Sequence, residues 1–422
     1  METNSKLKKN LISLIVLTLS GSFIYTLPYF RSYYYSAFMD AFGMTNTQMG
    51  LCGTVFGLIG SVSYLFGGII VDYFSARKLI PLSMILTGGL GLCLLLSPPT
   101  WAIVLIHGLW GVTSLMTFWP ALMKCIRALA SSNEQGKAFG IFEGGRGIFN
   151  AGYLAVAAAI FGKMIAAGSE KMGVKTIIIF YSAMTIGLGF LNLYLLRGID
   201  DQSDKKEGFK LKTILQPIKI PEIWLMIGII FSTLTVSTGY YYISPYATKI
   251  LGASAMLGVI LTSSSQYIRP AASFLAGVLG DKINSSKVML IGQLGLVAGL
   301  IILLMSKSSM GIVPIIIGSL IIFASMYICV SMHFAIMVEI DCPAECEGAA
   351  IGLICCLGYL PEAASPFVAG KLLDHFSGAF GYRLFFIYML AIVILGIVLT
   401  LIWFKRTKNK RTQILQSDKN NL

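Results

Sequence analysis

Mostly apolar stretches of about 20 residues recur along nearly the whole chain, and they restrict its fold more than any other feature. In a bilayer the backbone must satisfy its own hydrogen bonds, so such stretches cross the lipid as helices. Charged residues make up only 12% of the 422 residues, about half the share of a typical soluble domain. This composition excludes a soluble enzyme, a disordered scaffold and a fibrous protein. We predict an all-α membrane protein with twelve transmembrane helices, at residues 11–34, 47–71, 79–98, 101–124, 138–163, 174–196, 222–248, 254–280, 287–306, 311–338, 347–371 and 380–404.

The distribution of Lys and Arg predicts the orientation of these spans. An even number of spans places both termini on one side, and most of the 32 Lys and Arg residues fall on that side. Because basic residues concentrate in cytoplasmic loops, we expect both termini in the cytoplasm of a multi-pass protein of the cell inner membrane. The net charge of +13 is then a topology signal, and we expect the lipid bilayer rather than a nucleic acid as the partner.

The longest polar stretch lies near the middle of the chain and separates two groups of six spans. It predicts four parts: an N-terminal six-helix bundle at 1–196, a cytoplasmic linker at 197–221, a C-terminal six-helix bundle at 222–404, and a cytoplasmic tail at 405–422.

The two predicted bundles share a repeated segment, found after the second and the eighth span. Its members are Gly68, Asp72, Arg77 and Lys78 in one copy, and Gly277, Asp281 and Lys287 in the other. The glycine, the aspartate and the final lysine superpose at a single offset close to half the chain length. This indicates two homologous halves, a known plan of membrane transporters in which the substrate site lies near the middle of the membrane.

The repeated Gly-x-x-x-Asp-x-x-x-x-Arg-Lys pattern resembles the signature loop of the major facilitator superfamily, with Ser75-Ala76 in place of the usual Gly-Arg. Ser75–Pro81 and the Ser244-Pro245 pair are similar to the organophosphate:phosphate antiporter branch and its uncharacterised bacterial relatives. The resemblance implies two pseudo-symmetric six-helix bundles, the major facilitator fold. It also implies transport by alternating access, in which one bundle rocks against the other.

The repeated segment predicts conformational gating. An aspartate at a cytoplasmic helix end can accept hydrogen bonds from the free N–H groups at the start of a neighbouring helix. Asp72 would meet the eleventh span and Asp281 the fifth, only when the cytoplasmic side is closed. The alternative is a plain solvated turn.

Arg269 is the sharpest candidate for substrate binding. It lies roughly 18 Å from the cytoplasmic edge, at 1.5 Å of helical rise per residue. A charge near the middle of a bilayer costs about 2.5–3.5 kcal/mol on insertion scales, so it needs a reason. A guanidinium suits bidentate capture of a carboxylate, phosphate or sulfonate, and Arg269 resembles in position the arginine of oxalate/formate and nitrate carriers. The alternative is a structural salt bridge.

Two carboxylates inside the spans are candidates for proton coupling. Glu362, near the middle of the eleventh span, could take up the proton or neutralise Arg269 when substrate is absent. Glu143 and Arg146 are three residues apart on the fifth span and can pair on one helix face. Arg146 could alternatively line the inner vestibule and capture an anion.

Arg31, near the outer end of the first span, is a further anion-binding candidate, since organophosphate carriers use an arginine on that span; a position at the membrane interface is the alternative. Further aromatic and amide side chains could contact a hydroxylated ligand, although most aromatic residues in such proteins belong to the core. These candidates are Tyr25, Tyr29, Trp119, Asn150, Gln266, Tyr267 and Tyr359.

Together these features predict a secondary transporter for a small organic anion, either a carboxylate, a sulfonate or a phosphorylated metabolite. We expect it to act as a monomer, by proton coupling or exchange, without metal or cofactor. Catalytic patterns and an ATP-binding loop are absent from the sequence, which argues against an enzyme. The alternatives are a transporter-like membrane sensor and a carrier of a neutral sugar or nucleoside-type solute.

Overall fold

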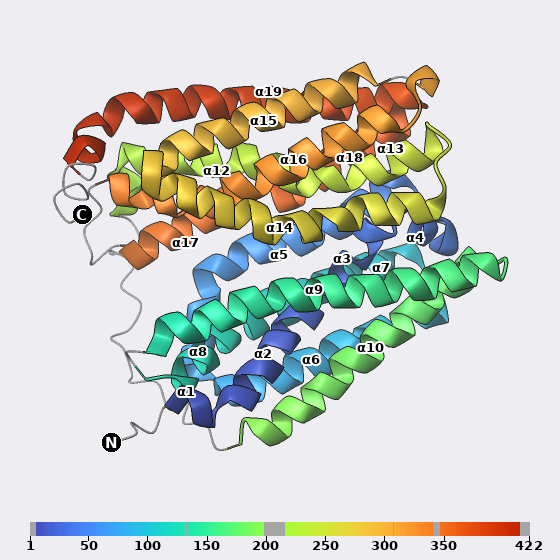
Figure 1. Cartoon of the computed structure of the whole chain (residues 1–422). Coiled ribbons are helices and arrows are strands. Elements are labelled where there is room, and N and C mark those ends of the chain that lie inside the picture. Colours follow the sequence, from blue (N-terminus) through green and yellow to red (C-terminus); the bar gives the residue numbers. More distant parts are fainter. Residues whose placement is uncertain (1–5, 132–133, 198–215, 307, 341–346, 414–422) are drawn as a thin grey trace. The chain divides into compact units, whose positions relative to one another are not determined.

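The computed structural model describes residues 6–131, 134–197, 216–306, 308–340 and 347–413, and the regular structure in these ranges is helical (Figure 1). Contacts between residues divide the chain into two units, Met1–Phe209 and Lys210–Leu422. Most of the predicted linker at 197–221 lies outside the described residues.

The N-terminal unit contains the first six predicted spans. Its elements are α1 (Lys6–Lys9), α2 (Leu11–Phe23), α3 (Thr26–Tyr33), α4 (Tyr35–Phe42), α5 (Asn46–Tyr73), α6 (Ala76–Cys93), η1 (Leu94–Leu96), α7 (Thr100–Trp110), η2 (Gly111–Phe118), α8 (Trp119–Leu129), α9 (Gln135–Ala166) and α10 (Glu170–Leu195).

The C-terminal unit contains the other six. Its elements are η4 (Pro217–Lys219), α12 (Pro221–Gly239), η5 (Tyr240–Tyr242), α13 (Ile243–Lys249), α14 (Ala255–Ile283), α15 (Ser285–Met305), η6 (Ser308–Met310), α16 (Val313–Met332), η7 (Ala335–Glu339), α17 (Glu347–Gly358), α18 (Pro361–His375) and α19 (Ala379–Arg406).

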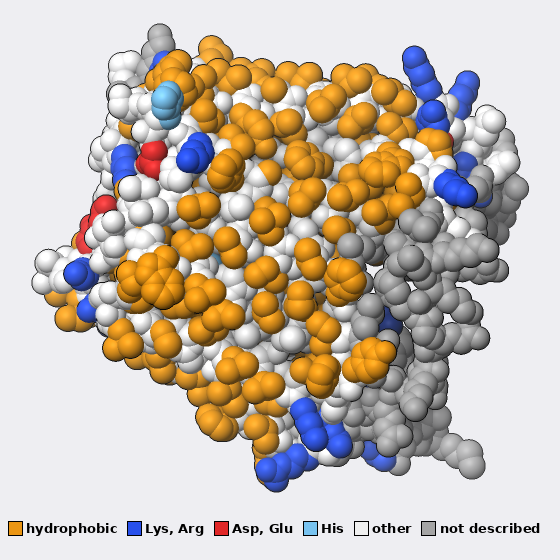
Figure 2. All heavy atoms as spheres, turned by 180° about the vertical axis from the view of Figure 1, so that it is seen from behind, with side chains coloured by type: hydrophobic (Ala, Val, Ile, Leu, Met, Phe, Trp, Pro, Cys, Tyr) orange, Lys and Arg blue, Asp and Glu red, His pale blue; other side chains and the backbone are white. Residues whose placement is uncertain are grey.

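Each of the twelve predicted spans coincides with a helix or a short series of helices. Within the described residues, nine helical segments are long and apolar enough to cross a membrane, and the bent pair α2 and α3 makes a tenth. The other two predicted spans correspond to α5 and α14, which are 28 and 29 residues long. Figure 2 shows one face of the molecule with hydrophobic side chains over most of its middle, as expected for a surface that faces lipid.

Two spans that we predict as continuous are broken near their middle. In the first span, α2 and α3 meet at an angle of 41°. Pro28 has no N–H to donate to the carbonyl of Ile24, which explains the break. In the eleventh span, α17 ends at Gly358 and α18 begins at Pro361, where the missing N–H is tolerated.

Helices within each unit approach closely at glycines and are linked by a few buried polar contacts. In the N-terminal unit Gly88 of α6 faces α10, and Asn192 donates to the hydroxyl of Ser20 at 2.7 Å. In the C-terminal unit Gly299 of α15 faces α16, and Thr400 donates to the Gln293 carbonyl oxygen at 2.9 Å. Small residues and interhelical hydrogen bonds are the usual means of holding helices together in lipid, where apolar burial gives little.

Candidate functional site

The C-terminal unit gathers polar side chains around Arg269. The guanidinium carbon of Arg269, on α14, lies 5.7 Å from the centre of the Tyr327 ring on α16. Gln266 is one turn before Arg269, so both side chains share a helix face, and its amide nitrogen donates to the Tyr327 hydroxyl at 2.9 Å. Gln266 and Tyr327 are buried, whereas Arg269 is half-buried. Tyr327 therefore links the predicted anchor to an amide group.

Hydroxyl groups extend this arrangement towards η5. Ser265 donates to the Tyr240 hydroxyl at 3.1 Å. The Tyr240 ring stacks on Tyr241 with 4.2 Å between ring centres and meets the edge of Phe323 at 5.1 Å. We call Tyr240, Ser265, Gln266, Arg269 and Tyr327 the Arg269 cluster. It combines one permanent positive charge with hydroxyl and amide groups, which suits an anion that also carries hydroxyls.

The N-terminal unit places Arg146 of α9 against aromatic rings. Its guanidinium carbon lies 4.9 Å from the Trp119 ring centre and 5.3 Å from that of Phe142. Its Nη1 donates to Glu143 at 3.1 Å, which confirms the predicted ion pair on one helix face. The Arg146 side chain is 13% exposed and that of Glu143 is 52% exposed. The charge of Arg146 is therefore balanced locally by an acid that reaches the surface of the unit.

The neighbours of Arg146 include three of the predicted ligand contacts, Tyr25, Tyr29 and Trp119. Residues that bind one ligand together have to lie close to one another in this way. The ring centres of Tyr25 and Trp119 are 6.1 Å apart, and those of Tyr25 and Tyr29 are 6.3 Å apart. Trp119 directly follows the π-helical turns of η2, a distortion that often marks functional positions. Asn150 lies one turn after Arg146 and is buried, and its Oδ1 has no hydrogen-bond partner in the described part of the chain. We call Tyr25, Tyr29, Trp119, Arg146 and Asn150 the Arg146 cluster.

Arg31 lies buried within the N-terminal unit rather than exposed at an interface. It is 6% exposed, and its Nε has no hydrogen-bond partner among the described residues. Cys52 of α5 and His107 of α7 lie within electrostatic range of it. The contacts that join the Arg146 cluster do not include Arg31, so its role in substrate binding remains a prediction.

Glu362 lies in the first turn of α18, directly after the break in the eleventh span. Glu362 is half-buried, and its backbone N–H donates to the Tyr359 carbonyl at 3.0 Å. The Thr238 hydroxyl donates to the carbonyl of Pro361 at 3.1 Å, which fixes the break against α12. The ion pairs between described residues do not include one between Glu362 and Arg269. Neutralisation of Arg269 by Glu362 is therefore not observed here.

The predicted gating residues are only partly described. The side chains of Asp72 and Asp281, and the surroundings of Gly68, lie outside the described residues, so their contacts stay predictions. Arg77 donates to the carbonyl of Arg197 at 3.0 Å. The remaining members are exposed or face open space, namely Lys78, Gly277 and Lys287.

Tyr267 and Tyr359, the other predicted ligand contacts, differ in exposure. Tyr267 is 51% exposed, and Tyr359 is half-buried close to Glu362. Within the described residues, His, Cys, Asp and Glu side chains form no group that could hold a metal ion.

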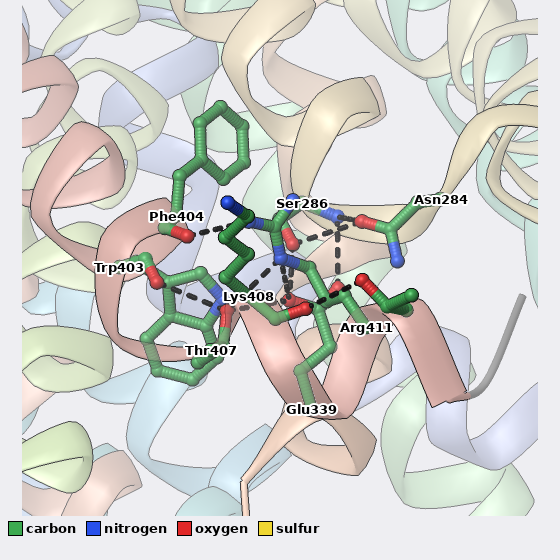
Figure 3. Close-up of polar contacts among 9 residues, drawn as sticks. Asn284, Ser286, Glu339, Trp403, Phe404, Thr407, Lys408 and Arg411 are labelled. Carbon is green, nitrogen blue, oxygen red and sulfur yellow. Dashed lines mark hydrogen bonds and ion pairs between the residues drawn. The ribbon is translucent and has the colours of Figure 1, made fainter.

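Sequence reasoning missed a buried carboxylate at the end of η7. The Glu339 side chain is 0% exposed and accepts hydrogen bonds from Ser286 of α15 and Trp403 of α19 (Figure 3). These partners are distant in the sequence, so no local pattern around Glu339 indicates them. Tyr327 was missed for the same reason, since only the fold brings it beside Arg269.

Comparison with known proteins identifies relatives of the whole chain. It is 28% identical over 422 residues to the inner membrane protein YihN of Escherichia coli K12, covering 97% of this chain and 99% of YihN. It is 27% identical over 410 residues to the inner membrane protein YqcE of the same organism, covering 94% and 95%.

Solved transporters share its fold at low sequence identity. A bacterial homologue of the human lysosomal transporter Spinster, inward-facing and occupied, matches with a TM-score of 0.70 and 13% identity over 94% of this chain and 97% of that one. The nucleoside transporter NupG matches with a TM-score of 0.70 and 15% identity over 96% and 99%. Residues 11–366 match the Major Facilitator Superfamily. The chain therefore belongs to the Major Facilitator Superfamily of secondary transporters.

Proposed function

We propose that this transporter moves a small organic anion that also carries hydroxyl groups, by alternating access coupled to protons or to exchange of a second anion. The carboxylate, sulfonate or phosphate group of the substrate would bind Arg269. The observation that carries the proposal is the Arg269 cluster, in which a permanently charged side chain lies near the middle of α14 beside hydrogen-bonded tyrosine and glutamine groups.

Charge and hydrogen bonding support this choice of substrate class. A guanidinium in hydrocarbon is costly and functional by default. Two parallel N–H groups would hold the acidic group, and the amide of Gln266 with the hydroxyls of Tyr240 and Ser265 would hydrogen-bond to the substrate hydroxyls.

The Arg146 cluster would contribute shape rather than net charge. Since Arg146 is paired with Glu143, the rings of Trp119 and Tyr25 are the larger feature. Aromatic faces pack against the C–H face of a hydroxylated ring or chain, and the tyrosine hydroxyl adds a polar end.

Glu362 would bind the coupling proton. A carboxylate half-buried at a break in the eleventh span can exchange a proton when the site opens to either side of the membrane. The protein would work as a monomer, with both termini in the cytoplasm.

Counterflow into proteoliposomes tests the substrate class. The purified protein is reconstituted with a panel of hydroxylated carboxylates, sulfonates, sugar phosphates, neutral sugars and nucleosides, each offered as trace label against an internal excess. We expect exchange of one or more anions and little exchange of the neutral solutes. Exchange restricted to a neutral sugar or nucleoside would refute the anion proposal while leaving the chain a transporter.

Arg269→Lys separates charge from geometry in the same assay. Lysine retains the positive charge and loses the planar fork, so we expect weaker but measurable exchange of the best anion. Exchange equal to that of the wild type after Arg269→Ala would show that the arginine does not bind the substrate.

A further inference from the structure

After α19 the chain turns, and side-chain contacts hold this turn against the C-terminal unit. Thr407 ends α19, its N–H donating to the Trp403 carbonyl at 2.9 Å, and residues 408–413 resume a helical conformation. Arg411 is 13% exposed and donates from Nη2 to the Phe404 carbonyl at 2.6 Å and from Nε to the Thr407 hydroxyl at 3.1 Å. We call residues 405–411 the basic turn.

Glu339 anchors this turn from the inside of the C-terminal unit (Figure 3). Its Oε2 accepts from the Trp403 indole N–H at 2.7 Å and lies 3.8 Å from Nε of Arg411. Ser286, at the start of α15, donates to Glu339 through both its N–H and its hydroxyl. A buried carboxylate satisfied by several donors is costly to move, so the position of Arg411 is fixed from α15, η7 and α19 together.

Four of the five basic residues of the turn form two groups, and the fifth, Lys410, is half-buried. Arg411 faces Glu339, and Arg406 pairs with Glu222 of α12 at 3.1 Å. Lys405 and Lys408 are exposed. The two arginines therefore pair with acids of the protein itself and fix the backbone, whereas Lys405 and Lys408 direct their charge outward.

We propose that this basic turn is a docking surface for the phosphate headgroups of anionic lipids in the cytoplasmic leaflet, presented by Glu339 and Arg411. The turn directly follows α19, a helix long and apolar enough to cross a membrane, so it would lie at the depth of the lipid headgroups. Basic residues placed there attract anionic lipid, and a turn already fixed by the protein loses little freedom when the lipid binds.

Lipid titration of the purified full chain tests the proposal. In neutral detergent the protein is mixed with increasing dioleoyl phosphatidylglycerol or dioleoyl phosphatidylcholine, and the unfolding temperature is followed. We expect stabilisation by phosphatidylglycerol to exceed that by phosphatidylcholine. In Lys405→Gln/Lys408→Gln the half-saturating concentration of phosphatidylglycerol should rise about 30-fold, from about fivefold per lysine.

The control variant Lys163→Gln/Lys171→Gln removes the same charge from two exposed lysines of the N-terminal unit. It should titrate like the wild type. An equal shift in the control would show a general charge effect, and no shift in Lys405→Gln/Lys408→Gln would show that these lysines only set topology; either result overturns the proposal.

Arg411→Gln tests the positioning role, because it keeps both lysines and releases the turn. We expect phosphatidylglycerol binding to weaken about fivefold with phosphatidylcholine unaffected, a difference that a general loss of stability would not produce. Unchanged discrimination between the two lipids would overturn the role of Arg411. If Arg411→Gln does not purify, Trp403→Phe removes one donor to Glu339, keeps an aromatic ring, and is judged by the same criterion.

Discussion

The two halves of the transporter each place an arginine against aromatic rings, but they surround it differently. Arg146 in the N-terminal unit pairs with Glu143 on the same helix and lies over Trp119. Arg269 in the C-terminal unit lies beside Tyr327, whose hydroxyl accepts a hydrogen bond from the Gln266 amide. The two units therefore surround their arginines with different chemistry, and the difference predicts that the C-terminal unit binds the substrate charge.

The largest effect should come from the two arginines. We expect Arg269→Ala to reduce initial uptake of the best anion at least about 100-fold, because two charge-assisted hydrogen bonds contribute roughly 1.5–3 kcal/mol each. Arg146→Ala should reduce it only about fivefold, since Glu143 already balances that charge. Uptake into proteoliposomes, normalised to the amount of reconstituted protein, measures both. A reversed order of the two losses would move the anion site to the N-terminal unit.

The two carboxylates Glu362 and Glu143 are expected to differ in the same way as the two arginines. We expect Glu362→Gln to reduce proton-driven accumulation about tenfold or more while counterflow exchange continues, because exchange needs no net proton movement. Glu143→Gln should leave accumulation nearly unchanged, since the Glu143 side chain is 52% exposed and forms an ion pair with Arg146. Accumulation is measured with an imposed pH gradient, and counterflow in the same vesicles is the control. Loss of coupling in Glu143→Gln alone would assign the proton to the N-terminal unit.

These contrasts could be predicted only in part from the sequence. The spans follow directly from the apolar runs, and the position of Arg269 near the middle of α14 follows from its place in the eighth predicted span. The break before Thr26 could have been predicted from Pro28, since a proline cannot complete the preceding turn. Tyr327 and the partners of Glu339 could not, because packing between helices distant in the sequence brings them together.

A third contrast concerns two glutamates, Glu134 and Glu339, which contact residues near the start of the first span and near the end of the last span. In the N-terminal unit Glu134 accepts from the N–H of Leu7 at 3.2 Å and from Ser131, and it is only half-buried. Glu339 is fully buried. Removing the charge of a buried, hydrogen-bonded carboxylate leaves its donors poorly satisfied.

We therefore expect Glu339→Gln to lower the free energy of unfolding by about 2–3 kcal/mol and Glu134→Gln by under about 1 kcal/mol. Thermal unfolding of both variants in the same detergent and lipid measures the difference. Equal losses would show that burial does not distinguish the two anchors.

The smallest effects are expected from alanine at Gly88 and Gly299, the glycines at which helices approach closely in the two units. A Cβ on Gly88 would lie 2.5 Å from Cγ1 of Ile186 and 2.9 Å from the Ser182 carbonyl oxygen. A Cβ on Gly299 would lie 2.6 Å from Cγ1 of Ile322 and 3.0 Å from the Gly318 carbonyl oxygen. In each unit, therefore, a helix has to move away from a backbone oxygen that cannot turn aside, at a cost of about 1–2 kcal/mol.

Gly89→Ala is the matched control, because nothing lies within 4 Å of a Cβ at that neighbouring position. There alanine should be neutral or stabilise the helix by up to about 1 kcal/mol. We expect Gly88→Ala and Gly299→Ala to lower the unfolding temperature by similar amounts and Gly89→Ala to leave it level or raise it. Similar losses in the two units would mean that both units depend on the same close packing of helices although their charged sites differ. A loss in only one unit would mean that the two units also differ in how closely their helices pack.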